Sequence, residues 1–182
     1  MKDIITYMQE GFKLGKNKVS KTTEYEYFPK DRMELYYLIR DRLKEDENAD
    51  LNDIDVSNID DMSFLFSTLD PHDIDISEWN VSKVKNMTSM FNDCPNFNCD
   101  LSNWDVSNVE YMYNMFSHCI LFDSDLSRWN VSKIIDMGYM FYNCKKFKGK
   151  LLEKWNVSKV WDMYNMFQGC QSVPSWYKNK IK

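Results

Sequence analysis

The chain has 182 residues, of which 43% are hydrophobic and 28% charged, and its formal net charge is −5 at pH 7. No run approaches the roughly 20 apolar residues that a membrane-spanning helix needs, so we expect no membrane span. The acidic balance argues against a general nucleic-acid-binding protein, which usually presents a basic face.

Residues 1–28 are expected to form a flexible N-terminal segment. A polar stretch at 15–21 separates its start from the rest of the chain, and such a stretch cannot offset its own ordering entropy. Apolar side chains near helical spacing come before it: Ile4, Tyr7, Met8 and Phe12. Two interpretations stay open, because a short helix here fits either a groove on a partner or the end of its own folded domain.

A capping helix is expected within residues 29–49. Asp31–Lys44 places Leu35, Leu38, Ile39 and Leu43 on one face, and the pair Asp31 and Glu34 is typical of a helix start. The C-terminal residues 171–182, with Val173, Pro174, Trp176 and Tyr177, are expected to cover the opposite end of the domain.

Residues 50–170 contain five repeat units, whose equivalent positions lie 25 or 26 residues apart. Apolar residues recur at fixed positions in every unit. The columns include Trp79, Trp104, Trp129 and Trp155; Val56, Val81, Val106, Val131 and Val157; Met62, Met87, Met112, Met137 and Met163; and Phe66, Phe91, Phe116, Phe141 and Phe167. A repeat of this length indicates units that bury their apolar faces by stacking on one another.

The spacing within a unit predicts an α/β fold. Tryptophan and valine two residues apart suggest a short strand, and the steps of three and four from Val109 to Cys119 suggest a short helix. The intervening serine, as in Ser57 and Ser107, is a candidate helix N-cap. We therefore expect a short repeat solenoid, like a leucine-rich repeat, with one strand and one short helix per unit. The extra residue of the fifth repeat is expected in a loop at 149–154.

The stretch LSNWDVSNVEYMYNMFSHC and its copies resemble the BspA-like family of divergent leucine-rich-repeat proteins. The resemblance covers residues 27–177. It implies a stacked strand-and-helix solenoid and roles in binding, often adhesion. Residues 1–20 also resemble a leader seen on proteins of gut bacteriophages, which implies a phage-encoded member.

No arrangement for catalysis or for a cofactor emerges, so we expect neither an enzyme nor a bound cofactor. The five cysteines are expected to be reduced core thiols, because one must in any case stay unpaired. An acidic column recurs at Asp50, Asp75, Asp100 and Asp125. Carboxylates can bind a cation such as Ca²⁺, but they can equally accept backbone N–H groups in turns, and the column ends at Leu151. The second interpretation is favoured.

Aromatic residues outside the core columns give the candidate binding site. They gather in units three to five: Tyr111, Tyr113, Tyr139, Tyr142, Trp161 and Tyr164. Tyrosine and tryptophan are frequent anchors at interfaces, although packing along the flank would also explain them. A second variable column, Asp53, Glu78, Asn103, Arg128 and Lys154, changes sign along the chain.

These patterns predict a non-enzymatic module that presents its surface to a protein partner of unknown identity. The alternative is a structural or adhesion component of a phage particle or bacterial surface, tethered through residues 1–28. The first residues lack the apolar region and small-residue cleavage site of a signal peptide, so we expect a location in the cytoplasm or in a phage particle.

Overall fold

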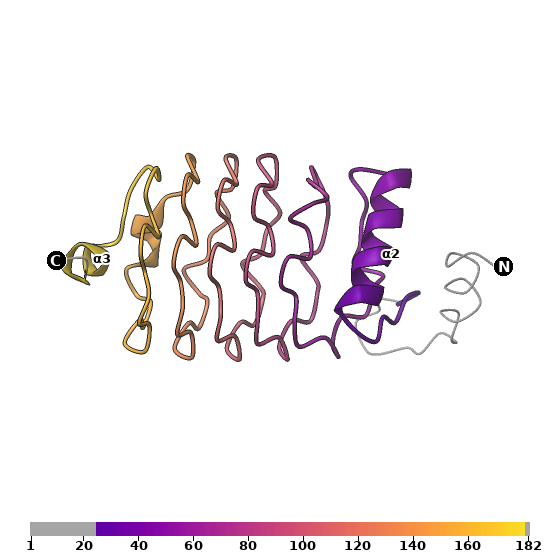
Figure 1. The fold of residues 1–182 in the computed structure, drawn as a ribbon, viewed down its shortest axis with the longest axis horizontal. Helices are drawn as coiled ribbons and strands as arrows, with labels where there is room; N and C mark the ends of the chain where they lie inside the picture. The colour runs from indigo at the N-terminus through magenta and orange to yellow at the C-terminus, as the bar shows by residue number, and fades with distance from the viewer. Residues whose placement is uncertain (1–24, 181–182) are drawn as a thin grey trace.

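The computed structural model describes residues 25–180, with three short helical elements (Figure 1). The α-helix α2 spans Arg32–Glu45, the 3-10 helix η1 spans Gly149–Leu152, and the α-helix α3 spans Ser175–Lys180. Between α2 and α3 the chain winds in similar coils stacked along the long axis of the molecule (Figure 1). We call each repeat unit a rung; rungs 1 to 5 begin at Asp50, Asp75, Asp100, Asp125 and Leu151.

The α/β class expected from the sequence is wrong. Between residues 50 and 170 the structure has no strand, and its one helical element is η1. Neighbouring rungs instead share isolated parallel bridges, such as those of Tyr111 with Asn86 and with Asp136. The units are turn-rich coils, so the strand-and-helix solenoid implied by the leucine-rich-repeat resemblance is not the architecture of this chain.

Tight turns replace the expected helix. In rung 3 the Met115 N–H donates to the Met112 carbonyl (3.3 Å), which spans three residues rather than the four of an α-helix. The backbone at Asn114 and His118 has φ angles of 60° and 63°, a left-handed conformation that interrupts a right-handed helix. Such turns bring the same side chains inward as a helical stripe would. Pairs of residues with positive φ recur in the rungs: Phe64 and Asp70; Ser89 and Asp93; Asn114 and His118; Tyr139 and Asn143; Asn165 and Gly169.

A second set of backbone hydrogen bonds joins each rung to the next. The Met112 N–H donates to the Asp136 carbonyl (3.0 Å), and the Asn114 N–H donates to the Gly138 carbonyl (2.8 Å). Alternate residues thus donate across rungs, while residues between them, such as Met115, close turns within a rung. Residues that close turns within their own rung do not pair with the next rung, and only isolated bridges join neighbouring rungs.

The serines do not cap helices, so that expectation is also wrong. The Ser107 N–H donates to the Asp105 carboxylate (3.0 Å), and the Ser57 N–H donates to the Asp55 carboxylate (2.9 Å). This arrangement is an Asx turn, in which the side chain of Asp or Asn accepts from the backbone two residues later. The acceptors in the five rungs are Asp55, Asn80, Asp105, Asn130 and Asn156.

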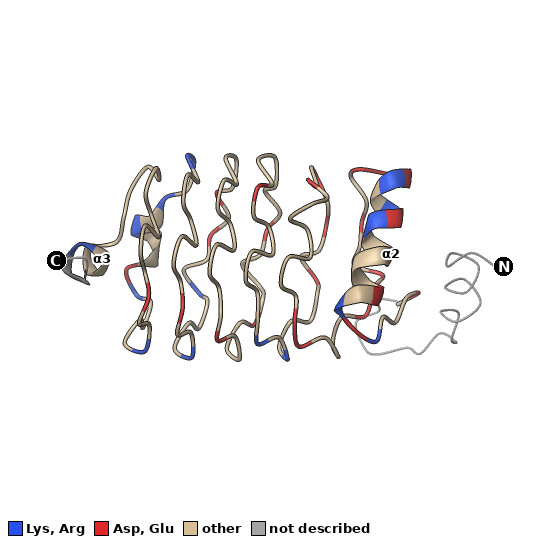
Figure 2. Ribbon diagram, viewed as in Figure 1, with Lys and Arg blue, Asp and Glu red and all other residues tan. Residues whose placement is uncertain are grey.

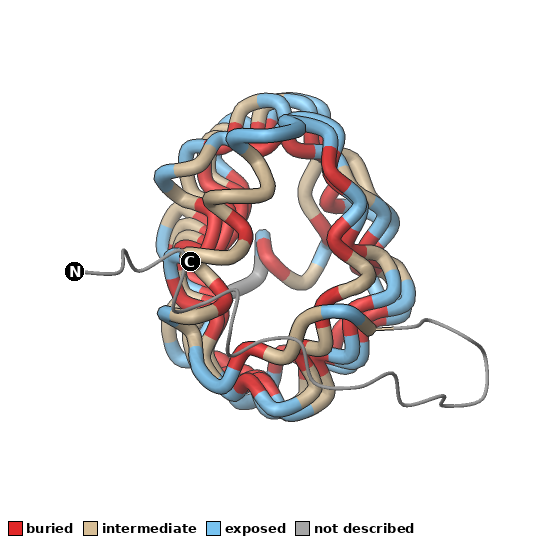
Figure 3. Tube along the Cα trace, turned by 90° about the vertical axis from the view of Figure 1, so that its right-hand side faces the viewer, coloured by how far each residue is buried: buried red, intermediate tan, exposed pale blue. Residues whose placement is uncertain are grey.

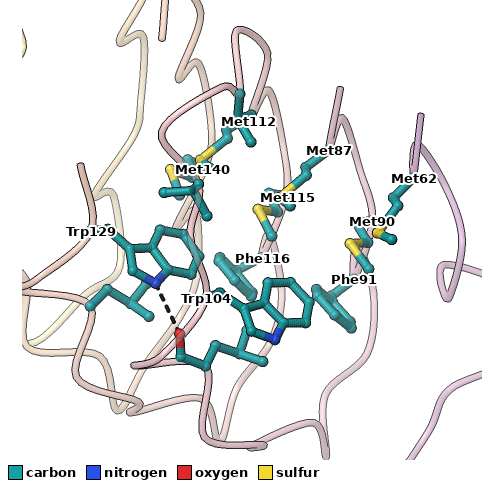
Figure 4. Close-up of a cluster of buried hydrophobic side chains, with 14 of the residues drawn as sticks. Met62, Met87, Met90, Phe91, Trp104, Met112, Met115, Phe116, Trp129 and Met140 are labelled. Carbon is teal, nitrogen blue, oxygen red and sulfur yellow. Dashed lines mark hydrogen bonds between the residues drawn. The ribbon is translucent and has the colours of Figure 1, made fainter. Parts of the chain in front are cut away.

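Repeated side chains form continuous columns through the interior, and buried residues line the inner side of the coils (Figure 3). The rings of Phe91, Phe116 and Phe141 stack with centroids 5.5 and 5.6 Å apart. Two methionine columns run beside them (Figure 4). Each rung therefore completes the core of its neighbours, and none could bury these side chains alone.

The tryptophans add a polar contact to this packing. The Trp104 indole Nε1–H donates to the Ile76 carbonyl (3.1 Å), and that of Trp129 donates to the Leu101 carbonyl (2.9 Å; Figure 4). In both pairs the acceptor lies in the preceding rung. Buried indole N–H groups need a partner, so this bond lets a large ring enter the core without an unsatisfied donor.

Helices cover both ends of the columns. The N-cap Asp31 accepts from the backbone of Met33 and Glu34, and α2 buries Leu35 and Ile39 against the core. The helix expected at 31–44 is therefore present. At the other end, the Trp176 indole donates to the Leu152 carbonyl (2.9 Å), which repeats the tryptophan contact of the rungs one step further.

Removal of one core tryptophan should be costly. We expect Trp104→Ala to lower the free energy of unfolding by about 3–5 kcal/mol, the usual cost of an aromatic-to-alanine change in a core. Urea denaturation followed by circular dichroism measures it. The control is Trp161→Ala, whose side chain is 73% exposed and whose loss should stay within about 0.5 kcal/mol. Equal losses in both variants would contradict the column packing.

The thiols should react slowly in the folded protein. Burial raises the pKa of Cys119 and Cys144 well above the usual range and that of Cys94 to about 12, so these groups stay protonated at pH 8. Only thiolates react readily with a disulfide reagent such as DTNB. We expect five thiols per chain in denaturant, with Cys99, only partly buried and with a pKa raised to about 11, the fastest when folded. Rapid reaction of Cys119 in the native state would show that the column is open to solvent.

Candidate partner-binding surface

The six aromatic residues singled out in the sequence lie on the surface or at its margin. We call this set, Tyr111, Tyr113, Tyr139, Tyr142, Trp161 and Tyr164, the aromatic face. Trp161 and Tyr164 are 73% and 63% exposed, and Tyr111 and Tyr113 are 40% and 37% exposed. Tyr139 and Tyr142 are half-buried. None of the six belongs to a core column.

Four of these rings form one connected group. The Tyr139 ring lies between those of Tyr113 and Tyr164, with centroids 5.8 and 5.4 Å away and edge-to-face geometry in both cases. Tyr142 extends the group at 5.5 Å from Tyr139. Within the described part of the chain, Tyr111 and Trp161 make no ring contact with the group. The rings thus span rungs 3 to 5, and their mutual packing restricts their motion before any partner binds.

A glycine makes room for this arrangement. Gly138 occupies, in rung 4, the position that Tyr113 and Tyr164 hold in rungs 3 and 5. A Cβ at Gly138 would lie 3.1 Å from the Tyr113 ring and 3.3 Å from the Asp162 carboxylate, both closer than ordinary contact. A third side chain in this column would therefore displace Tyr113, and Tyr139, the next residue, lies between the other two tyrosines instead.

Tyr111 breaks a regular feature of the rungs. At the equivalent position the other rungs have Asp or Asn, whose side chain accepts the backbone N–H two residues later. The acceptors are Asp61, Asn86, Asp136 and Asp162, with distances of 2.8 to 3.0 Å. A tyrosine cannot make this turn, so rung 3 lacks one stabilising bond and exposes an aromatic ring instead.

The acidic column at Asp50, Asp75, Asp100 and Asp125 forms turns. Each carboxylate accepts the backbone N–H two residues later, at 2.9 Å in all four rungs. For Asp100 and Asp125, the bonds from Ser102 and Ser127 lower the pKa of the carboxyl. Between residues 25 and 180, no group of three or more His, Cys, Asp or Glu side chains is arranged to hold a metal ion. The geometry therefore supports the turn interpretation of this column.

The surface charge changes from acidic to basic along the stack, as the variable column that begins at Asp53 suggested. Acidic residues predominate on the coils nearest α2, and lysines lie on loops of the coils nearest α3 (Figure 2). Arg42 neutralises Asp53 at 2.9 Å, and the other members of the column, Glu78, Asn103, Arg128 and Lys154, are exposed. The column is a solvated row of side chains.

One open groove escaped the sequence analysis. It has a volume of about 630 Å³ and is lined by Asn58, Asp60, Lys83, Lys85, Asn108, Glu110 and Lys133. Its asparagines and lysines alternate at the repeat step, and Lys83 Nζ donates to the Asn58 side chain (2.8 Å). The alternation is visible in the sequence and could have pointed to this groove. Only the stacking of the rungs shows that the lysines and asparagines contact one another.

The N-terminal segment assigned to residues 1–28 lies largely outside the described residues, which begin at Tyr25. Its expected docking helix and linker therefore stay predictions. No helix in the described range is both long enough and apolar enough to cross a membrane.

Comparison with known proteins identifies a family. The family described as "Mycoplasma protein of unknown function, DUF285" matches residues 34–153 and 124–180. No curated protein and no solved structure matches the chain. The two family matches overlap, run from α2 into α3, and together take in all five rungs. The chain therefore belongs to the family of Mycoplasma proteins of unknown function, DUF285.

Proposed function

We propose that this protein is a non-enzymatic interaction module that binds a protein partner through the aromatic face of rungs 3 to 5. The observation that carries the proposal is the exposure of large rings on a rigid stack, above all Trp161 at 73% and Tyr164 at 63%. Tyrosine and tryptophan provide much of the binding energy at protein interfaces, because they bury a large area with few rotatable bonds.

Tyr111 supports the proposal independently. A buried or turn-forming hydrogen bond typically contributes about 0.5–1.5 kcal/mol to stability, and rung 3 gives up such a bond at this position. Exposed aromatic side chains also favour aggregation. A residue that lowers stability and solubility together is expected where a protein needs the side chain for binding.

The repeat motif supports the same class of function. We further propose that the units are related to BspA-like repeats, on the likeness of LSNWDVSNVEYMYNMFSHC and its copies. That relationship implies binding or adhesion. A phage-encoded origin and a tether through residues 1–28 belong to the alternative, a structural component of a phage particle or bacterial surface.

The partner can be captured by photo-crosslinking. Benzoylphenylalanine placed at Trp161 should crosslink a protein from a lysate of the source organism, and the same group at Phe64 should not. Phe64 is a fitting control because it is 53% exposed but lies in rung 1, outside the aromatic face. Mass spectrometry then identifies the partner for quantitative binding assays.

Tyr111→Asn should separate stability from binding. Asparagine restores the turn that Asn86 makes in rung 2, so we expect a gain of about 1 kcal/mol and a rise of about 2–4 °C in melting temperature. Loss of the ring should weaken binding of the identified partner about tenfold or more. Calorimetry measures both quantities.

The reciprocal variant is the control for this experiment. Asn86→Tyr removes the equivalent turn in rung 2, so it should destabilise by a similar amount and leave the affinity unchanged. If Tyr111→Asn binds the partner as tightly as the unaltered chain, the aromatic face is not the binding surface.

A further inference from the structure

Two carboxylates lie within the aromatic face. Asp136 and Asp162 occupy the same column in rungs 4 and 5, and each accepts one backbone N–H through Oδ1: Gly138 to Asp136 (2.9 Å) and Tyr164 to Asp162 (2.8 Å). The second oxygen of each carboxylate has no hydrogen-bond partner in the described part of the chain. Both residues are partly buried, and neither of these oxygens is a fully buried atom without a partner.

Neither carboxylate has a cationic partner among the described residues. Lysines occur in a neighbouring column at Lys133 and Lys159, but Lys133 donates to the side chain of Asn108 instead. Burial raises the pKa of Asp136, and the charge of Asp162 raises it further, against the lowering effect of the Gly138 N–H. Two like charges are thus held side by side without neutralisation, which is unfavourable unless a cation approaches.

One ring of the aromatic face lies close to the Asp162 carboxylate. The Tyr113 ring and the Asp162 carboxylate both lie within 3.3 Å of the point where a Gly138 side chain would begin. Gly138 itself is buried, and its lack of a side chain lets the Tyr113 ring and the Asp162 carboxylate approach the same point. Trp161 directly precedes Asp162, and Tyr164 follows it by two residues. A carboxylate close to an exposed aromatic ring favours the approach of an organic cation.

We propose that the aromatic face binds a basic segment of its protein partner, with an arginine side chain seated against Asp136 and Asp162 near the Tyr113 ring. This inference rests on the proposed function and adds the chemistry of the partner. Charge complementarity carries it, because the surface offers two unpaired carboxylates among rings. Arginine fits better than lysine, since its planar guanidinium stacks on aromatic rings and donates to two carboxylate oxygens together.

A synthetic peptide tests the chemistry without knowledge of the natural partner. The probe is a fluorescein-labelled peptide of alternating arginine and glycine, and fluorescence anisotropy with the full chain measures its affinity. The control peptide carries citrulline, which keeps the shape of arginine and lacks its charge. We expect the citrulline peptide to bind at least about tenfold more weakly. Equal binding of both peptides would overturn the proposal.

Matched variants locate the site. Asp136→Asn with Asp162→Asn removes both charges and keeps the turns, since Asn86 makes the same turn in rung 2 (3.0 Å). We expect the arginine peptide to bind about tenfold more weakly to this double variant, because the charge-assisted contacts are lost. The control is Asp100→Asn with Asp125→Asn, which changes the net charge equally at two carboxylates that also form turns.

The control should keep the unaltered affinity within about twofold. Equal weakening in both double variants would show that the peptide responds only to overall negative charge, and it would overturn the proposal. The melting temperature of each variant, measured in the same samples, excludes unfolding as the cause. If the arginine peptide does not bind while Tyr111→Asn still weakens the captured partner, the interaction function stands and the basic partner is refuted.

Discussion

The structure depends on the register between successive rungs. Each rung donates backbone hydrogen bonds to the next, so the equivalent residues of all rungs must lie directly above one another. Identical side chains then meet along the axis, and the phenylalanine, methionine, tryptophan and cysteine columns follow from that one constraint. The small polar groups within the core follow the same register: the thiol of Cys144 donates to the Phe116 carbonyl of the preceding rung, just as the indole of each column tryptophan does. A side chain that left its column would break both its own packing and that of two neighbours.

The sequence was sufficient to locate the repeats, the buried columns and α2. It was not sufficient for the local conformation, because steps of three and four residues arise from consecutive turns as well as from a helix. Asn114, Asn143 and Gly169 are residue types that favour positive φ and were the available warning. Tyr139 and Phe64 adopt the same conformation without any such preference, since the neighbouring rungs impose it. The serine was similarly ambiguous, because a serine after Asp or Asn suits a helix start and an Asx turn equally well.

The aromatic face was also only partly predictable from the sequence. Its six members could be found from their positions outside the columns, and that much needs only the repeat. The role of Gly138 could not, because it depends on contacts with Tyr113 in the rung before and Asp162 in the rung after. Asp136 and Asp162 share one repeat position, but only the structure shows that, among the described residues, the second oxygen of each carboxylate has no hydrogen-bond partner. Surface sites on stacked rungs combine residues across units, and they become apparent only when the units are placed side by side.

One further consequence comes from η1, the short helix that accommodates the extra residue before rung 5. After it the register resumes: the Trp155 indole reaches the Leu126 carbonyl at 3.0 Å, and the Met137 N–H reaches the Asp162 carbonyl at 2.9 Å. The extra residue at η1 therefore leaves the later columns in place, whereas an insertion within the turns would shift every column that follows it. In evolutionary terms, such a chain can lengthen by recombination that duplicates whole units, and a small change of length is accommodated where η1 lies.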